Sequence, residues 1–161
     1  MTTIPDGAFL VFLLQLPLRL APRMNELAPR GASPAMMRKK KQIQAELDSL
    51  IFVARTRHPD WSARFETKGV IRKTKKGPRP GVMRVGGRRR LVRVTRHSAR
   101  RPDELSVDVI GGKLPIDRLV AAGILVNDNH GWLERLADWR PAHGEAQRVI
   151  VEVFELPPPP P

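Results

Sequence analysis

The chain has 161 residues, of which 41% are hydrophobic and 28% charged, which is the size and composition of one globular domain. It has no cysteine, which excludes disulfide bonds and thiolate-bound metal centres and fits a reducing, cytoplasmic compartment. The net charge is +13, and residues 64–101 hold 15 of the 29 Lys and Arg residues but only one acidic residue. Such a block predicts a polyanionic partner, because each neutralised phosphate releases counterions; the alternative is a solvated basic loop.

The first predicted element is a strand over residues 8–16, preceded by a tail of seven residues. Its residues are apolar on both faces, which is typical of a central strand in a sheet. The run is too short to cross a bilayer. No positive segment precedes it and no cleavage site follows it, so we expect neither a signal peptide nor a membrane partner.

A helix is predicted from Ser33–Pro34 to about Arg57, because serine caps helices and proline suits the first helical position. Its apolar residues recur at helical spacing and form a core face. Four cations stand in its first turns, where the helix dipole disfavours them: Arg38, Lys39, Lys40 and Lys41. They either contact phosphates or form a solvated helix end.

The basic segment is divided by Gly and Pro, which favours either a hairpin or a mobile loop between about residues 68 and 90. Residues 88–97 then alternate as a strand. We expect DNA contacts from the cations of this segment together with those of the helix. The candidates here are Lys73, Lys75, Lys76, Arg88, Arg89, Arg90, Arg100 and Arg101.

Carboxylates follow the basic segment and surround one lysine, Lys113. They are Asp103, Glu104, Asp108, Asp117 and Asp128. Carboxylate oxygens are ligands for Mg²⁺, which can activate water and neutralise charge on a phosphate, and a nearby lysine adds to that stabilisation. Simpler explanations remain open: Lys113 and Asp117 have the spacing of an ordinary helical ion pair, and Asp128 has the setting of a turn residue.

The remaining elements are short. A helix is predicted from Leu114 to Ala122, closed by Gly123, followed by a short strand over residues 124–126. Trp132, Leu136 and Trp139 have a spacing that suits the core or a dimer surface. A final strand covers residues 149–154, and the prolines at 157–161 predict a tail outside the sheet.

The segment that begins at Lys113 resembles the core motif of the RusA-type Holliday junction resolvases, many of which are phage or prophage proteins. In that family a K-x-x-x-D-x-L helix is followed by a glycine, a few apolar residues and an acidic pair. This chain matches the motif without a gap from Lys113 through Asp117 and Gly123 to Asn127–Asp128. Weaker likenesses are the Leu16–Pro17 pair with Asn25, the Arg100–Arg101 pair and the final strand.

The resemblance covers most of residues 8–156. It implies an α+β fold with a small mixed sheet packed by two main helices, in an intertwined homodimer. It also implies an endonuclease that cuts four-way DNA junctions with Mg²⁺, or Mn²⁺, in the cytoplasm of a bacterial or phage-infected cell. By position, Lys113 matches the catalytic lysine of the family and Asp128 its later catalytic aspartate.

The chain departs from the family upstream of the lysine. The usual D-x-D-N-L pattern, which supplies two metal ligands together, is replaced by Asp103–Glu104 and, four residues later, Asp108. We expect Asp108 to act as a catalytic metal ligand beside Asp128, with Asp103 or Glu104 as a further ligand. The alternative function is a non-catalytic nucleic-acid-binding protein, either a degenerate family member or an RNA binder.

Overall fold

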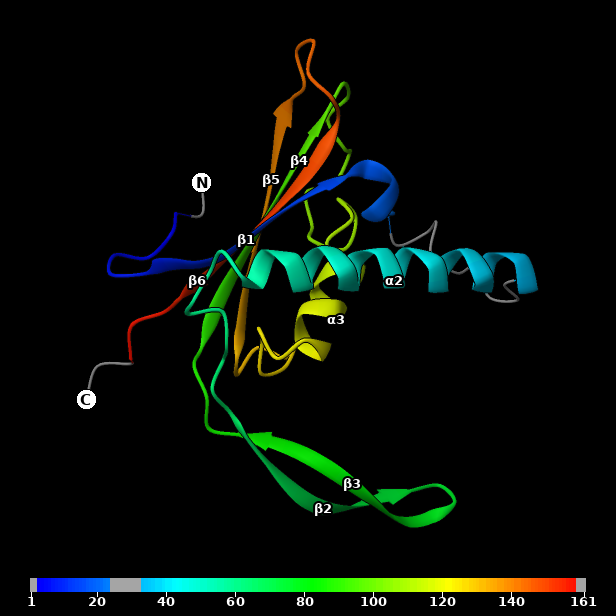
Figure 1. The fold of residues 1–161 in the computed structure, drawn as a ribbon, viewed down its shortest axis with the longest axis vertical. Helices are drawn as coiled ribbons and strands as arrows, with labels where there is room; N and C mark the ends of the chain where they lie inside the picture. The colour runs from blue at the N-terminus through cyan, green and yellow to red at the C-terminus, as the bar shows by residue number, and fades with distance from the viewer. Residues whose placement is uncertain (1–2, 24–32, 159–161) are drawn as a thin grey trace.

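The computed structural model describes residues 3–23 and 33–158. Asn25, which contributed to the resemblance, and prolines 159–161 lie outside these ranges. The elements in chain order are β1 (Phe9–Pro17), a 3-10 turn η1 (Leu18–Leu20), α2 (Pro34–Arg55), β2 (Glu66–Thr74), β3 (Gly77–Val85), β4 (Arg90–Ser98), α3 (Lys113–Ala121), β5 (Leu133–Pro141) and β6 (Arg148–Glu155). The fold is therefore α+β, with a mixed four-stranded sheet, a two-stranded hairpin and two α-helices (Figure 1).

The four-stranded sheet has the order β1-β6-β4-β5. β6 pairs antiparallel with both β1 and β4, whereas β4 and β5 pair in parallel. The prediction that the first strand is central is wrong, because β1 lies at an edge of this sheet. Its apolar residues on both faces do not imply two covered faces, since Phe9 is 50% exposed and Leu13 37% exposed.

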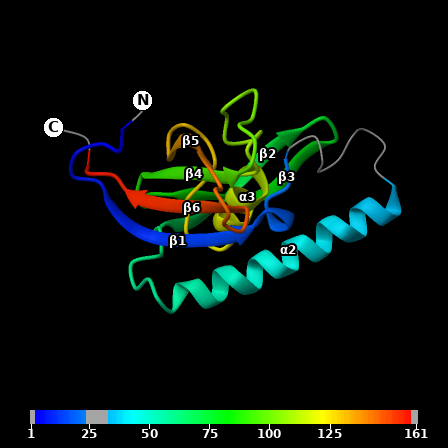
Figure 2. The same ribbon diagram turned by 90° about the horizontal axis from the view of Figure 1, so that it is seen from above.

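α2 begins and runs as the sequence predicts. Ser33 caps it by accepting a hydrogen bond from the amide of Met36, and Ile43, Leu47 and Ile51 are its buried residues. These residues join the core that β1, β4, β6 and α3 share, and Figure 2 shows α2 lying along β1. Arg118 of α3 forms a two-pronged ion pair with Asp48 of α2, at 2.7 and 2.8 Å, which ties the two helices together.

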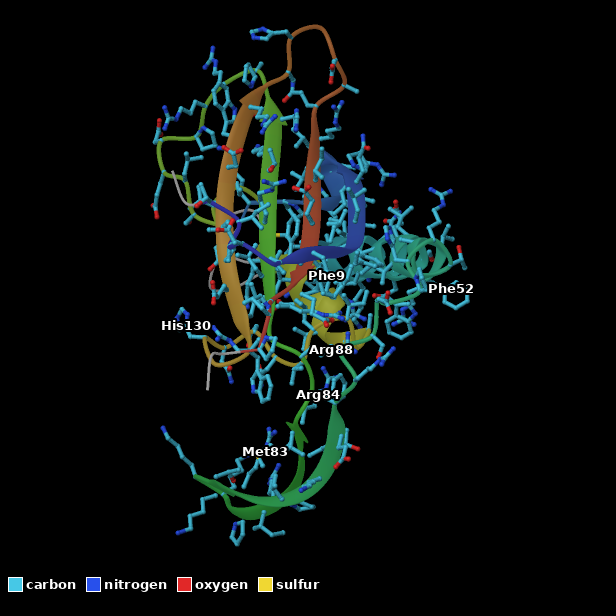
Figure 3. The ribbon with its side chains drawn as sticks, turned by 90° about the vertical axis from the view of Figure 1, so that its left-hand side faces the viewer. Phe9, Phe52, Met83, Arg84, Arg88 and His130 are labelled. Atoms are coloured by element: carbon cyan, nitrogen blue, oxygen red, sulfur yellow. The ribbon has the colours of Figure 1, made fainter. Side chains whose placement is uncertain are left out.

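β2 and β3 form a hairpin that projects away from the body (Figure 1). Of the two expectations for the basic segment, the hairpin is therefore the one observed. Arg84 stands at its base, with Met83 farther out (Figure 3). Arg84 Nη1 donates hydrogen bonds to the carbonyl oxygens of Val120, Leu125 and Val126, at 2.6, 3.3 and 3.2 Å. Its guanidinium also lies 4.4 Å from the centre of the Phe65 ring.

Two regions differ from the sequence-based expectation. Residues 124–126 are buried but form no strand, because the amides of Ile124 and Leu125 bond back to the carbonyl oxygen of Leu119 and close the end of α3. Residues 133–141, expected only to contribute core or dimer contacts, form β5. Over the described residues, no helix is long and apolar enough to span a membrane.

Candidate functional site

The ammonium group of Lys113 is the centre of a small charged cluster. Lys113 is the first residue of α3, and its Nζ lies 3.0 Å from Asp117 Oδ1 and 3.4 Å from Asp128 Oδ2. The pKa of Lys113 is raised above its ordinary value, chiefly by the hydrogen bond to Asp117; partial burial opposes the shift, and the charge of Asp117 and the contact with Asp128 add to it. Lys113 is therefore a cation throughout the neutral pH range.

A second cation, Arg135 of β5, connects Asp128 to Asp108. Its Nη2 donates a 2.6 Å hydrogen bond to the backbone carbonyl of Asp128 and lies 3.8 Å from Asp128 Oδ2. Its Nη1 lies 3.8 Å from Asp108 Oδ1, which is too long for a hydrogen bond. Asp108 Oδ1 is buried and has no hydrogen-bond donor. One guanidinium thus spans both predicted catalytic aspartates, at the wall of a pocket of about 370 Å³.

Tight packing of two glycines brings Asp108 and Lys113 to this place. Gly111 has a φ of +98°, and a side-chain carbon there would lie 2.2 Å from the carbonyl oxygen of Ala21. A side-chain carbon at Gly112 would lie 2.5 Å from Val107. Only glycine permits such an approach, so the turn before α3 is pressed against the body, and Asp108 and Lys113 are held at its two ends.

Two arginines of the basic segment hold the chain that leads to Asp128. Arg84 donates to the carbonyls of Leu125 and Val126, and Arg90 Nη1 donates to the carbonyl of Ile124 at 2.7 Å. A buried carbonyl without a strand partner needs such a donor. These two cations therefore replace the missing strand ladder of residues 124–126 and position the loop that carries Asp128.

The predicted metal ligands do not all come together. Within residues 3–23 and 33–158, no group of three or more His, Asp or Glu side chains is arranged to hold a metal ion. Asp103 and Glu104 are exposed and do not join Asp108 and Asp128 in such a group. From the carboxylates predicted around Lys113, the structure pairs Asp117 and Asp128 with the lysine, links Asp128 to Asp108 through a guanidinium, and adds Arg135 as the residue that carries it.

One predicted DNA contact is wrong. Arg90 is fully buried, with a relative exposure of 0%, so phosphates cannot reach it. Its guanidinium donates to the carbonyls of Asp60, Trp61, Ser62 and Ile124 and to Glu155. Burial lowers the pKa of Arg90, and its bond to Glu155 opposes that shift. Arg90 therefore stabilises the fold.

The other predicted cations divide into paired and unpaired groups. Arg88 forms a 2.5 Å ion pair with Glu155, and Arg89 a 2.6 Å ion pair with Glu134. Exposed side chains that form no ion pair in the described part of the chain include Lys73, Lys75 and Lys76 of the hairpin, Arg38, Lys39 and Lys41 of α2, and Arg100 and Arg101; Lys40 is half-buried and also unpaired.

These unpaired groups occupy different places. In both Figure 1 and Figure 2 the hairpin and the N-terminal half of α2 extend toward the same side, and in Figure 1 α3 lies between them. Arg100 and Arg101 follow the C-terminal end of β4, whereas the Asp128 loop precedes the start of β5. Because β4 and β5 are parallel, the arginine pair begins at the opposite end of the sheet from that loop.

Sequence reasoning did not identify Arg135 or Arg84 as site residues. Arg135 lies in a strand that the sequence did not predict, so its approach to two distant aspartates had no local signal. Arg84 belongs to the basic segment, where one arginine resembles another. A signal was present in the apolar run 124–126, which follows a helix end and needs donors for its carbonyls.

Comparison with protein-family models, with curated proteins and with solved structures found no match to this chain.

Proposed function

We propose that this protein is a metal-dependent endonuclease of the RusA type that cuts four-way DNA junctions in recombination, repair or phage DNA processing. The observation that carries the proposal is the meeting of Lys113, Asp128 and Asp108 around the guanidinium of Arg135. The candidate site lies at the same end of the body as the base of the basic hairpin. Figure 3 labels His130, which lies two residues after Asp128, and Arg84, which stands at the base of the hairpin.

The two aspartates fit a magnesium ion that shares its coordination with substrate. Mg²⁺ binds through one or two carboxylates and completes its shell with waters and phosphate oxygens. Asp108 Oδ1 is a buried acceptor without a hydrogen-bond donor, so Asp108 could offer an oxygen to such an ion, and Asp128 lies on the other side of the same Arg135 guanidinium. When bound, Mg²⁺, or Mn²⁺, would supply an activated water and neutralise phosphate charge.

The protein's own cations have distinct tasks in this proposal. Lys113, held by Asp117 and Asp128, presents a positive charge where negative charge develops on the scissile phosphate. Arg135 lies 3.8 Å from each of the two aspartates and offsets their charge; if Asp108 and Asp128 held a metal ion, this guanidinium would have to move away from them. The unpaired cations of the hairpin and of α2 hold the DNA backbone, so recognition depends on shape and charge more than on base edges.

The proposal includes a homodimer. A four-way junction must be cut on two strands at symmetric positions, and a two-fold protein matches a two-fold substrate. Light scattering should give a mass close to twice that of the 18.1 kDa chain.

A second candidate, a nucleic-acid-binding protein without catalysis, is favoured by the same cluster. Asp128 is already within 3.8 Å of both Lys113 and Arg135, so its charge is largely compensated within the protein. Asp108 is flanked by Val107 and Val109, and no second carboxylate stands beside it in the sequence. A site balanced by its own cations gains less from a metal ion than an open one.

Incubation with a synthetic four-way junction and with linear duplex, in Mg²⁺ or in EDTA, separates the two functions. We expect paired nicks on the junction only with Mg²⁺. Asp128→Asn should abolish cutting and leave junction binding intact or stronger, because it removes a negative charge. Asp6→Asn, which removes the same charge at an exposed position before β1, should cut normally.

Tight junction binding without cutting at any Mg²⁺ concentration would establish the non-catalytic alternative. Normal cutting by Asp128→Asn would show that the catalytic site lies elsewhere.

A further inference from the structure

The hairpin β2–β3 has two chemically different faces. Residues paired across an antiparallel ribbon point to the same face, and successive pairs alternate. The pairs Gly69–Val82 and Ile71–Pro80 therefore share one face, and Arg72–Arg79 lies on the other. Ile71 is 71% exposed and Val82 59% exposed, so they form an apolar ridge that no described part of the chain covers.

The charges of the hairpin are unbalanced as well as exposed. Its one acidic residue, Glu66, stands at the base, while Lys75 and Lys76 form the turn at the tip. Arg72 and Arg79 stand directly opposite each other in the ribbon; Arg72 Nη2 donates a 2.6 Å hydrogen bond to the carbonyl of Val82, which leaves Arg79 as the cation of this pair that has no partner among the described residues. Within the described residues, Lys68, Lys73, Lys75, Lys76 and Arg79 form no ion pair.

The outer edge of β3 is closed to another strand. Pro78 and Pro80 carry no amide hydrogen, and both lie in β3 at alternate positions on one edge of the ribbon. Prolines at an edge prevent a further strand from pairing there. The β3 edge of the ribbon therefore does not accept a further strand, which argues against pairing of β3 with a second copy of the chain.

We propose that the hairpin enters the major groove of a DNA arm, with the Ile71–Val82 ridge toward the base edges and the cations on the flanking phosphates. This inference rests on DNA as the partner in the proposed function. B-DNA has a major groove about 12 Å wide, which admits a two-stranded ribbon. The ridge meets thymine methyl groups there, and the lysines at the tip reach the far phosphate backbone.

The position of the hairpin links this contact to the candidate site. Arg72, Met83 and Arg84 line a pocket of about 200 Å³ together with Val126 and Asn127, and Asn127 directly precedes Asp128. A DNA arm gripped by the hairpin is thereby placed beside the Asp128 loop. The hairpin contains no Asn, Gln or Asp, and Arg72 and Arg79 lie on the face opposite the ridge, away from the base edges, so we expect little discrimination among bases.

Two hairpin variants test the proposal, with binding to a linear duplex measured in EDTA so that no cutting is required. The first replaces Lys73, Lys75, Lys76 and Arg79 with Gln. Each phosphate contact contributes about 0.9 to the slope of log affinity against log salt, so the slope should fall by roughly 3 to 4. The loss of affinity between 50 and 200 mM salt should then shrink by about 100-fold.

The second variant, Ile71→Thr with Val82→Thr, retains the β-branched shape that suits a strand and removes apolar surface. We expect about 10-fold weaker binding with an unchanged salt slope, since loss of one to two methyl contacts removes on the order of 1.4 kcal/mol. The matched control is Phe52→Thr with Val53→Thr on α2, whose exposures of 69% and 52% are similar. The control should bind as the native chain does.

Methylation by dimethyl sulfate identifies the groove, because it modifies guanine N7 in the major groove and adenine N3 in the minor groove. Protection of guanine N7 that is lost in Ile71→Thr/Val82→Thr supports the proposal. Protection of adenine N3 instead, or unchanged binding by both hairpin variants, overturns it. A change of oligomeric state in either variant, measured by light scattering, overturns it too, because the hairpin would then hold a second copy.

The footprinting test of the hairpin is independent of the nuclease assay. A hairpin-dependent major-groove footprint can be obtained from a chain that cuts no junction, and junction cutting can persist in a chain whose hairpin leaves no footprint.

Discussion

Strand β4 and the β2–β3 hairpin are consecutive and similarly rich in arginine and lysine. Their cations differ in whether they form ion pairs with acidic side chains. In and around β4, Arg88, Arg89, Arg90 and Arg93 all pair with glutamates of β5 and β6. In the hairpin the cations form no ion pair within the described residues; Arg72 and Arg84 donate only to backbone carbonyls. Part of the apparent basic block is therefore neutralised by glutamates of the fold itself.

The difference follows from the neighbours that each strand acquires. β4 lies between β6 and β5, and the glutamates of those strands face its arginines: Glu155 faces Arg90, and Glu152 faces Arg93. β2 and β3 pair only with each other, and neither brings a carboxylate to the cations at the tip. The net charge of a segment thus indicates surface charge only where folding leaves the segment without acidic neighbours.

The largest expected change in stability comes from replacing Arg90. Arg90→Met should lower the free energy of unfolding by about 3–5 kcal/mol, because Glu155 and several buried carbonyls lose their donor. Urea denaturation followed by circular dichroism measures the change. Arg79→Met, at an exposed position of the hairpin, should change stability by less than about 0.5 kcal/mol. Equal losses in the two variants would contradict the division between internal and surface arginines.

The next largest loss of stability is expected for Arg84. This residue lies in the hairpin but donates its hydrogen bonds to carbonyls of the body. Arg84→Met should cost about 1–3 kcal/mol, because three part-buried carbonyls lose a charged donor. Hydrogen exchange should become faster for the amides of residues 124–128. If exchange there is unchanged, Arg84 does not position the Asp128 loop.

The ion pair between Arg93 and Glu152 should contribute less to the free energy of unfolding. Its two hydrogen bonds, at 2.6 and 2.8 Å, are two-pronged, but the arginine side chain is 30% exposed, so solvent screens part of the attraction. A double-mutant cycle with Arg93→Met and Glu152→Gln should report a coupling of about 1 kcal/mol. A coupling near zero would mean that Arg93, like the hairpin cations, gains no stability from an ion pair.

The smallest expected effect is a gain of stability. Arg79→Thr removes one member of the like-charged pair with Arg72, so the protein should gain a few tenths of a kcal/mol at low salt. The same change should weaken duplex binding. A loss of stability above about 0.5 kcal/mol would mean that the hairpin arginines support the fold.

Local patterns in the sequence predicted the parts of the fold that depend on local chemistry. The Ser33 cap with Pro34 predicted the start of α2, and the alternation of residues 149–154 predicted β6. The spacing around Lys113 predicted α3 and the ion pair of Lys113 with Asp117. These features are visible in the sequence because each depends on residues a few positions apart.

The features that the sequence did not reveal depend on distant partners. No strand was predicted for β5: the spacing of Trp132, Leu136 and Trp139 indicated only core or dimer contacts, and the pairing of β5 with β4 joins residues more than 40 positions apart. The edge position of β1 could not be read from its apolar residues. Arg135 reaches the two aspartates only because β5 lies parallel to β4, so this part of the candidate site was not foreseeable.

The parallel pairing of β4 and β5 has a consequence for how such a protein can change. Parallel neighbours require a long crossover, and here that connection contains α3. Asp108, Lys113, Asp117 and Asp128 all lie within it, and Arg135 follows two residues into the next strand. The residues of the candidate site thus lie in one continuous segment, from Asp108 to Arg135, between two strands that pair directly with each other. If the proposed function is correct, substitutions in this segment can change the chemistry of the site while β1, β4, β6 and the hairpin keep their sequence and their structure.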